Sequence, residues 1–85
     1  MNRKRLLARL AHGHLQNVAF RDMMNLAEGL GFRLDRVSGS HHVLTHDKLS
    51  EFLNLQDWGG EAKPYQIRQF LRLVEKYNLR LEDEG

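Results

Sequence analysis

The chain has 85 residues, of which 41% are hydrophobic and 28% are charged. This length fits one small domain, and the composition is that of a folded domain rather than a disordered segment. A large enzyme built around a nucleotide cofactor is excluded, because the chain is short and contains no glycine-rich phosphate loop. The chain has no cysteine, so disulfides, a thiol nucleophile and a cysteine-ligated zinc site are excluded as well.

The formal net charge is only +2, but the charges are segregated along the chain. Three of the last four residues are acidic, and no acidic residue precedes Asp22. A basic body with a short acidic tail favours a polyanionic partner, although a solvated basic surface has the same composition. Four basic residues lie near the start of the chain: Arg3, Lys4, Arg5 and Arg9.

No apolar run approaches the ~20 residues that cross a bilayer, and none follows the basic N-terminus as in a signal peptide. Together with the absence of cysteine, this predicts a cytoplasmic protein without a membrane partner.

Apolar residues at helical spacing predict three helices. The first covers residues 2–11 with Asn2 as its N-cap, and the second covers residues 22–30. Pro64 begins the last helix, over residues 64–77, at a position where a missing amide is tolerated. The predicted apolar stripe of the last helix consists of Ile67, Phe70, Leu71, Val74 and Tyr77.

Three short strands are predicted between the second and the last helix. Residues 32–37 begin with an alternating pattern that predicts a half-buried strand, and residues 41–46 and 52–56 predict two more. Residues 38–40 form a turn, and residues 57–63, with two glycines, are predicted to be a loop. The fold class is therefore α+β, with a three-stranded antiparallel sheet that packs one face on the helices.

The second predicted strand contains three histidines on two different faces. Its period of two places His41 with Val43, and His42 with Leu44 and His46. A histidine after a glycine turn, on the open face of a sheet, can reach a phosphate and move protons near neutral pH. The same position also suits a surface histidine without a role. His42 and His46 are expected to be inward or edge residues that hydrogen-bond to backbone carbonyls.

A metal site would need three ligands, and the five histidines are the candidates. Alternation separates His41 from His42 and His46, and neither cysteines nor a carboxylate triad accompany them. We therefore predict no metal and no cofactor. The remaining histidines, at positions 12 and 14, lie elsewhere in the chain.

Basic and aromatic residues surround the start of the last helix. Lys63 lies where free helix amides favour anions, and with Arg68 it could hold a phosphate; a solvated helix start is the alternative. Trp58 and Tyr65 could stack on an unpaired base. For Tyr65 we favour a structural role, in which its ring covers part of a thin hydrophobic core. For Trp58, stacking on a base and packing against the core remain equal alternatives.

Residues 39–46, Gly-Ser-His-His-Val-Leu-Thr-His, resemble the HicA family of toxin–antitoxin toxins. Gly31 and Phe32 before a strand, and residues 62–71 at the start of the last helix, are also similar to that family. The resemblance covers residues 18–79. It implies a double-stranded-RNA-binding-like α-β-β-β-α fold, ribonuclease activity on mRNA and an antitoxin, HicB, that covers the active site. It also implies that His41 is the active-site histidine.

The sequence thus predicts a single domain over residues 1–85. Residues 1–16 form a basic helical extension, residues 17–80 a HicA-like core and residues 81–85 an acidic tail. The expected activity is that of a metal-independent endoribonuclease, which cleaves single-stranded mRNA with His41 as its acid or base and is neutralised by a HicB-like antitoxin. The residues predicted to bind RNA are Ser40, Trp58, Lys63, Arg68, Arg3, Lys4, Arg5 and Arg9. A non-catalytic RNA-binding module and a protein-interaction domain with an exposed sheet edge remain alternatives on the same fold.

Overall fold

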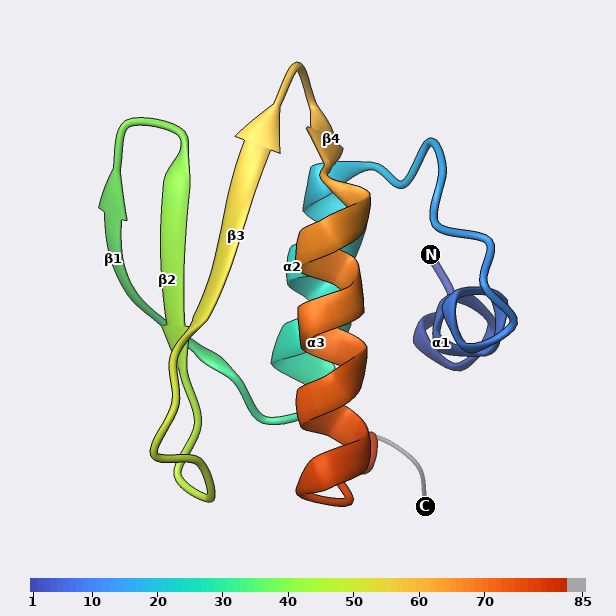
Figure 1. Ribbon diagram of the computed structural model, residues 1–85, viewed down its shortest axis with the longest axis vertical. Coiled ribbons are helices and arrows are strands. Elements are labelled where there is room, and N and C mark those ends of the chain that lie inside the picture. The colour runs from blue at the N-terminus through green and yellow to red at the C-terminus, as the bar shows by residue number, and fades with distance from the viewer. Residues whose placement is uncertain (83–85) are drawn as a thin grey trace.

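The computed structural model describes residues 1–82, so positions 83–85 of the predicted acidic tail lie outside the described residues. Within the described range, no helix is both long and apolar enough to cross a membrane. Three helices and four strands follow one another along the chain (Figure 1). They are α1 (Arg3–Ala11), α2 (Phe20–Gly29), β1 (Arg33–Ser38), β2 (His41–Thr45), β3 (Leu53–Trp58), β4 (Glu61–Ala62) and α3 (Pro64–Lys76).

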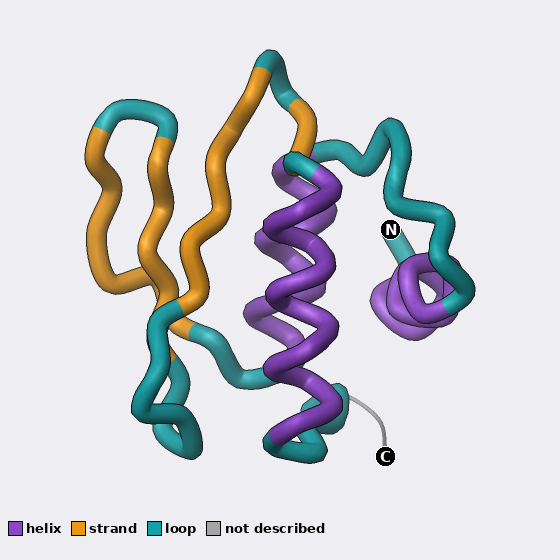
Figure 2. Tube along the Cα trace, viewed as in Figure 1, coloured by secondary structure: helices purple, strands orange, loops and turns teal. Residues whose placement is uncertain are grey.

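The strands form one antiparallel sheet in the order β1-β2-β3-β4 (Figure 2). The α+β prediction is confirmed, but the sheet has four strands rather than three. The additional strand, β4, lies within residues 57–63, which the sequence had suggested to be a loop. Gly59 and Gly60 have φ values of 61° and 88°, which suit a two-residue turn between β3 and β4. A Gly-Gly pair between two extended runs is the signal that indicates this hairpin.

The molecule is built in three layers. One face of the sheet packs on α2 and α3, and α1 lies on the opposite side of these two helices (Figure 1). Leu6 and Leu10 are the buried residues of α1, and the Asn2 side chain accepts the Arg5 N–H at 2.9 Å, which confirms the predicted N-cap. Fully buried side chains between the sheet and the helices include Leu44, Leu53, Leu55, Met23, Leu26, Ile67 and Phe70.

Strand β1 departs from the predicted half-buried pattern, because all six of its residues are exposed. Leu34 and Val37 have 46% and 51% of their surface exposed. The register with β2 also shifts between Leu34 and Arg36, which indicates a β-bulge at Asp35. The physical reason is position, since β1 is the edge strand that lies farthest from α3, whereas the other edge strand, β4, lies next to it in Figure 1.

The predicted stripe of α3 is correct only in part. Ile67 and Phe70 are fully buried, but Leu73 is buried as well, whereas Leu71 and Val74 are only half-buried. The helix therefore divides its apolar surface between the sheet and α1. A shallow hollow between α1 and α3 is lined by Leu7, Ala11, Leu71, Val74 and Glu75.

Candidate active site

A tight turn at Gly39 and Ser40 joins β1 to β2. Ser38 and His41 pair across this turn, and Gly39 has a φ of 59°. A glycine with positive φ at the first central position is typical of a type II′ hairpin turn, which matches the twist of the flanking strands. The Ser40 carbonyl accepts the Asp57 N–H at 2.9 Å, so the turn is also tied to β3.

His41, the first residue of β2, is exposed on the face of the sheet that the helices leave open. It pairs with Ser38 on β1 and with Gln56 on β3, and cross-strand partners share a face. Its ring makes no hydrogen bond with any residue between 1 and 82. Both ring nitrogens of His41 are therefore accessible to a bound molecule.

The neighbouring histidine has the opposite orientation, as the sequence predicts. His42 is half-buried, and its Nδ1 lies 3.1 Å from the Ser40 carbonyl oxygen. His46 behaves similarly at the other end of β2, with Nε2 at 2.9 Å from the Leu30 carbonyl oxygen. Because a carbonyl only accepts, each ring donates an N–H. The prediction that backbone carbonyls satisfy both histidines is confirmed.

Trp58 and Lys63 lie together near the same end of the sheet. Trp58 is 62% exposed and, two residues after Gln56, shares the open face with His41. The Lys63 Nζ is 5.6 Å from the centroid of the Trp58 ring, within the range of a cation–π contact. The fold therefore brings a histidine, an aromatic ring and a cation to one end of the sheet.

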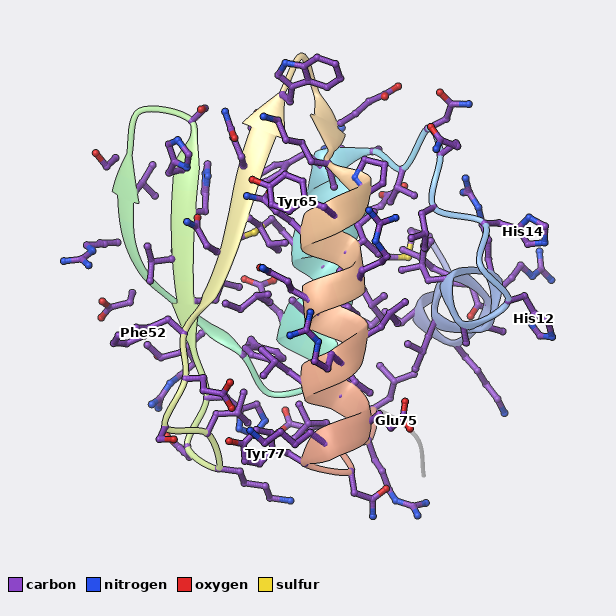
Figure 3. All side chains as sticks on the ribbon, viewed as in Figure 1. His12, His14, Phe52, Tyr65, Glu75 and Tyr77 are labelled. Carbon is purple, nitrogen blue, oxygen red and sulfur yellow. The ribbon has the colours of Figure 1, made fainter. Side chains whose placement is uncertain are left out.

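The role of Gln66 was not detectable from the sequence. It is only 3% exposed, and its Oε1 accepts the Gln56 N–H at 2.7 Å. This bond ties the first turn of α3 to the strand residue that faces His41. Tyr65 is 50% exposed, so the expectation that it caps the core is wrong; Figure 3 shows it near the start of α3. Nothing in the local sequence distinguishes the buried Gln66 from the exposed Gln69 three residues later.

The remaining RNA-binding candidates lie on α3 and α1. Arg68 is exposed on α3 and, within residues 1–82, forms no hydrogen bond or ion pair. The candidates on α1 lie on the far side of α2 and α3 from the sheet (Figure 1). Arg3 donates from Nε to Asn25 Oδ1 at 2.6 Å, and Arg9 donates to the Gln16 carbonyl. The predicted RNA-binding residues of α1 are therefore separated from those at the end of the sheet.

No three histidine, aspartate or glutamate side chains in residues 1–82 gather into a group that could hold a metal ion.

An ionic cluster lies elsewhere, between the β2–β3 loop and the end of α3. Glu51 accepts from the Tyr77 hydroxyl at 2.6 Å and from Lys76 Nζ at 3.0 Å. These hydrogen bonds lower the pKa of Glu51, and the bond to Glu51 raises the pKa of Lys76. Figure 3 shows Tyr77 at the opposite end of α3 from Tyr65.

The helix α2, an antiparallel meander of four strands and the final helix α3 define an α+β domain of the double-stranded-RNA-binding-like layout, here with an exposed histidine after the first hairpin turn. Residues 20–75 match the family described as HicA toxin of bacterial toxin-antitoxin. Because the match spans more than half of the chain, the protein belongs to this family, which implies a cognate antitoxin as its partner. Searches of curated proteins and of solved structures found no match. The matched region contains the His41 turn and most of α3, but not α1.

Proposed function

We propose that this protein is a HicA-like endoribonuclease that cleaves single-stranded mRNA with His41 as its acid and base. In this proposal the reaction needs no metal ion, and a HicB-like antitoxin neutralises the toxin by covering the site. The observation that carries the proposal is the exposed His41 ring on a constrained turn, at the same end of the sheet as Trp58 and Lys63, in a chain of this toxin family.

The proposed reaction is a transfer within the RNA itself. His41 takes the proton of a 2′-hydroxyl, and the 2′-oxygen attacks the adjacent phosphorus while the bond from phosphorus to the 5′-oxygen breaks. The leaving 5′-oxygen receives a proton from the imidazolium. The products are a 2′,3′-cyclic phosphate and a 5′-hydroxyl, so no covalent enzyme intermediate is needed.

The residues around His41 would hold the RNA in different ways. Trp58 offers an exposed ring on which an unpaired base can stack, and Lys63 offers a cation for the adjacent phosphate. Ser40, directly before His41, can hydrogen-bond to the same phosphate through its hydroxyl. Arg68 is exposed on α3, and the basic residues of α1 lie on the far side of α2 and α3, so we assign them a long-range attraction for RNA.

The test is incubation of the purified protein with single-stranded RNA and with DNA of the same sequence, with and without EDTA. We expect RNA cleavage that EDTA does not affect, cyclic phosphate ends, no cleavage of DNA, and cleavage by His41→Ala that is about 10²–10⁴ slower. Equal cleavage of DNA, or loss of activity in EDTA, would overturn the mechanism. RNA binding without any product would instead identify a non-catalytic RNA-binding module.

The exposed edge of the sheet supports a second role, which is binding of a protein strand. All six residues of β1 are exposed, and its outer edge has no strand partner in residues 1–82. Because β1 leads directly into the His41 turn, an antitoxin strand added here would end beside the site. Hydrogen exchange of the β1 amides, compared between the free toxin and its complex with the cognate antitoxin, tests this role. Unchanged exchange would rule it out.

A further inference from the structure

Two hydrogen-bond donors converge on the peptide group directly before His41. The Ser40 carbonyl oxygen accepts the Asp57 N–H at 2.9 Å and the Nδ1–H of His42 at 3.1 Å. The first bond belongs to the neighbouring strand, whereas the second comes from a side chain. Since a peptide unit is planar, a carbonyl held by two donors also fixes the amide on which His41 begins.

The same side chain is anchored on its other side. The ring of His42 lies against the ring of Phe20, with centroids 4.7 Å apart and an interplanar angle of 56°. Phe20 is buried, and its N–H donates to the Gly60 carbonyl at 2.8 Å, in the turn that follows Trp58. A continuous set of contacts thus joins the His41 turn to the Trp58 turn through the start of α2.

We infer that His42 is a positioning residue for the site. Its Nδ1–H fixes the Ser40 peptide, and its contact with Phe20 keeps the His41 turn in register with the turn after Trp58. His42 does not touch the reacting atoms, because it lies on the opposite face of β2 from His41. The inference rests on the proposed function, and it adds that the second histidine of the Gly-Ser-His-His segment acts through the first.

Two variants separate the hydrogen bond from the packing. His42→Asn places an amide N–H where Nδ1 lies and loses most of the ring, whereas His42→Leu keeps apolar contact with Phe20 and loses the donor. We expect kcat for RNA cleavage to fall about 10- to 100-fold in His42→Leu, the effect of a displaced catalytic group, and to be largely restored in His42→Asn. KM should change little in either variant. Thermal stability should follow the opposite order, with His42→Leu the more stable protein.

His46→Leu is the matched control, because His46 also donates to a backbone carbonyl but at the far end of β2. It should lower the melting temperature and leave kcat unchanged. If kcat in the His42 and His46 variants follows the order of their melting temperatures, His42 has only a structural role and the inference fails.

A second measurement separates this inference from the proposed function. If the wild type cleaves no RNA, the proposed function fails, but the exchange rate of the Asp57 amide still reports on the Ser40 carbonyl. That amide should exchange faster in His42→Leu than in His42→Asn. Equal rates in the two variants would overturn the positioning role independently of any activity.

Discussion

Two regions of the molecule carry the candidate RNA-binding residues, and they differ in kind. The α1 region has four basic residues within seven positions, yet Arg3 and Arg9 are bound to groups of the protein itself. The sheet end around His41 has fewer charges, but its turn is fixed by hydrogen bonds from β2 and β3. Clustered charge therefore indicates attraction for a polyanion, whereas an exposed side chain on a constrained turn indicates a chemical role.

This difference between the α1 region and the sheet end follows from the order of the three layers, in which α1 and the sheet lie on opposite sides of α2 and α3. α1 lies outside the region that matches the toxin family, and it contributes buried leucines that cover α2 and α3. Figure 3 shows His12 and His14 at this side of the molecule, away from the sheet. We therefore expect α1 to contribute stability and long-range attraction, and the sheet end to contribute catalysis.

The largest expected effect is on the rate of cleavage. His41→Ala should lower kcat by about 10²–10⁴, the usual contribution of one acid–base group, and should leave the fold intact because the ring is exposed. Arg5→Ala on α1 should leave kcat at saturating RNA unchanged. Single-turnover cleavage measures both. A similar loss in the two variants would remove the distinction between the regions.

The next effect is on stability. Leu10→Ala should lower the free energy of unfolding by about 2–5 kcal/mol, as Leu53→Ala should in the sheet, because both side chains are fully buried. Leu71→Ala should lower it by less, since Leu71 is only half-buried. Chemical denaturation measures these changes. If Leu10→Ala were as stable as the wild type, α1 would not be part of the packed structure.

A smaller effect concerns the salt dependence of RNA affinity. Each phosphate contact to a single strand contributes about 0.7 to the slope of log K against log salt concentration. We expect Lys63→Ala to reduce the slope by about this amount, and Arg5→Ala to reduce it by less. Affinity measured over a salt series tests this. Equal reductions would place α1 on the path of the bound RNA.

The smallest effect concerns the cluster at Glu51. Its lowered pKa means that the ionised form is favoured by folding, so its stabilisation is present above the ordinary value of 4.5 and is lost as the pH falls through the lowered pKa. Lys76, with a raised pKa, stabilises the fold below its ordinary value of 10.5, and this stabilisation is lost as the pH rises through the raised pKa. Tyr77→Phe should therefore lower the melting temperature slightly at neutral pH and not in strong acid. Cleavage should not change. A difference that persists in strong acid would contradict this assignment.

Local patterns of the sequence predicted the features that depend on local geometry. Alternation along β2 placed His41 on one face and His42 and His46 on the other, because successive strand residues point in opposite directions. Asn2 and Pro64 marked the starts of α1 and α3 through capping and backbone preferences that act within one turn.

Other features depend on which elements meet, and the sequence alone did not predict them. β1 is exposed because it lies at the edge of the sheet, beyond the area that the helices cover. The buried residues of α3 depend also on α1, which packs against the side of α3 that faces away from the sheet. In the site, His41 was found through its turn and its family resemblance. Gln66 and Phe20 act through contacts with residues distant in the chain, at positions 56 and 42. Such contacts leave no periodic signal.

The bulge at Asp35 has a consequence for the solubility of the protein. A flat apolar edge strand can pair with strands of other molecules, and sheets extended in this way form fibrils. In β1 the ladder is interrupted at Asp35 and the charged Arg36 directly follows the interruption, whereas Arg33 forms an ion pair with Asp47 at 2.7 Å. A strand that adds to this edge, including the proposed antitoxin strand, must match the irregular spacing at Asp35 and approach the charge of Arg36. We therefore expect the protein to remain dispersed at concentrations at which a regular strand with the same apolar side chains would aggregate.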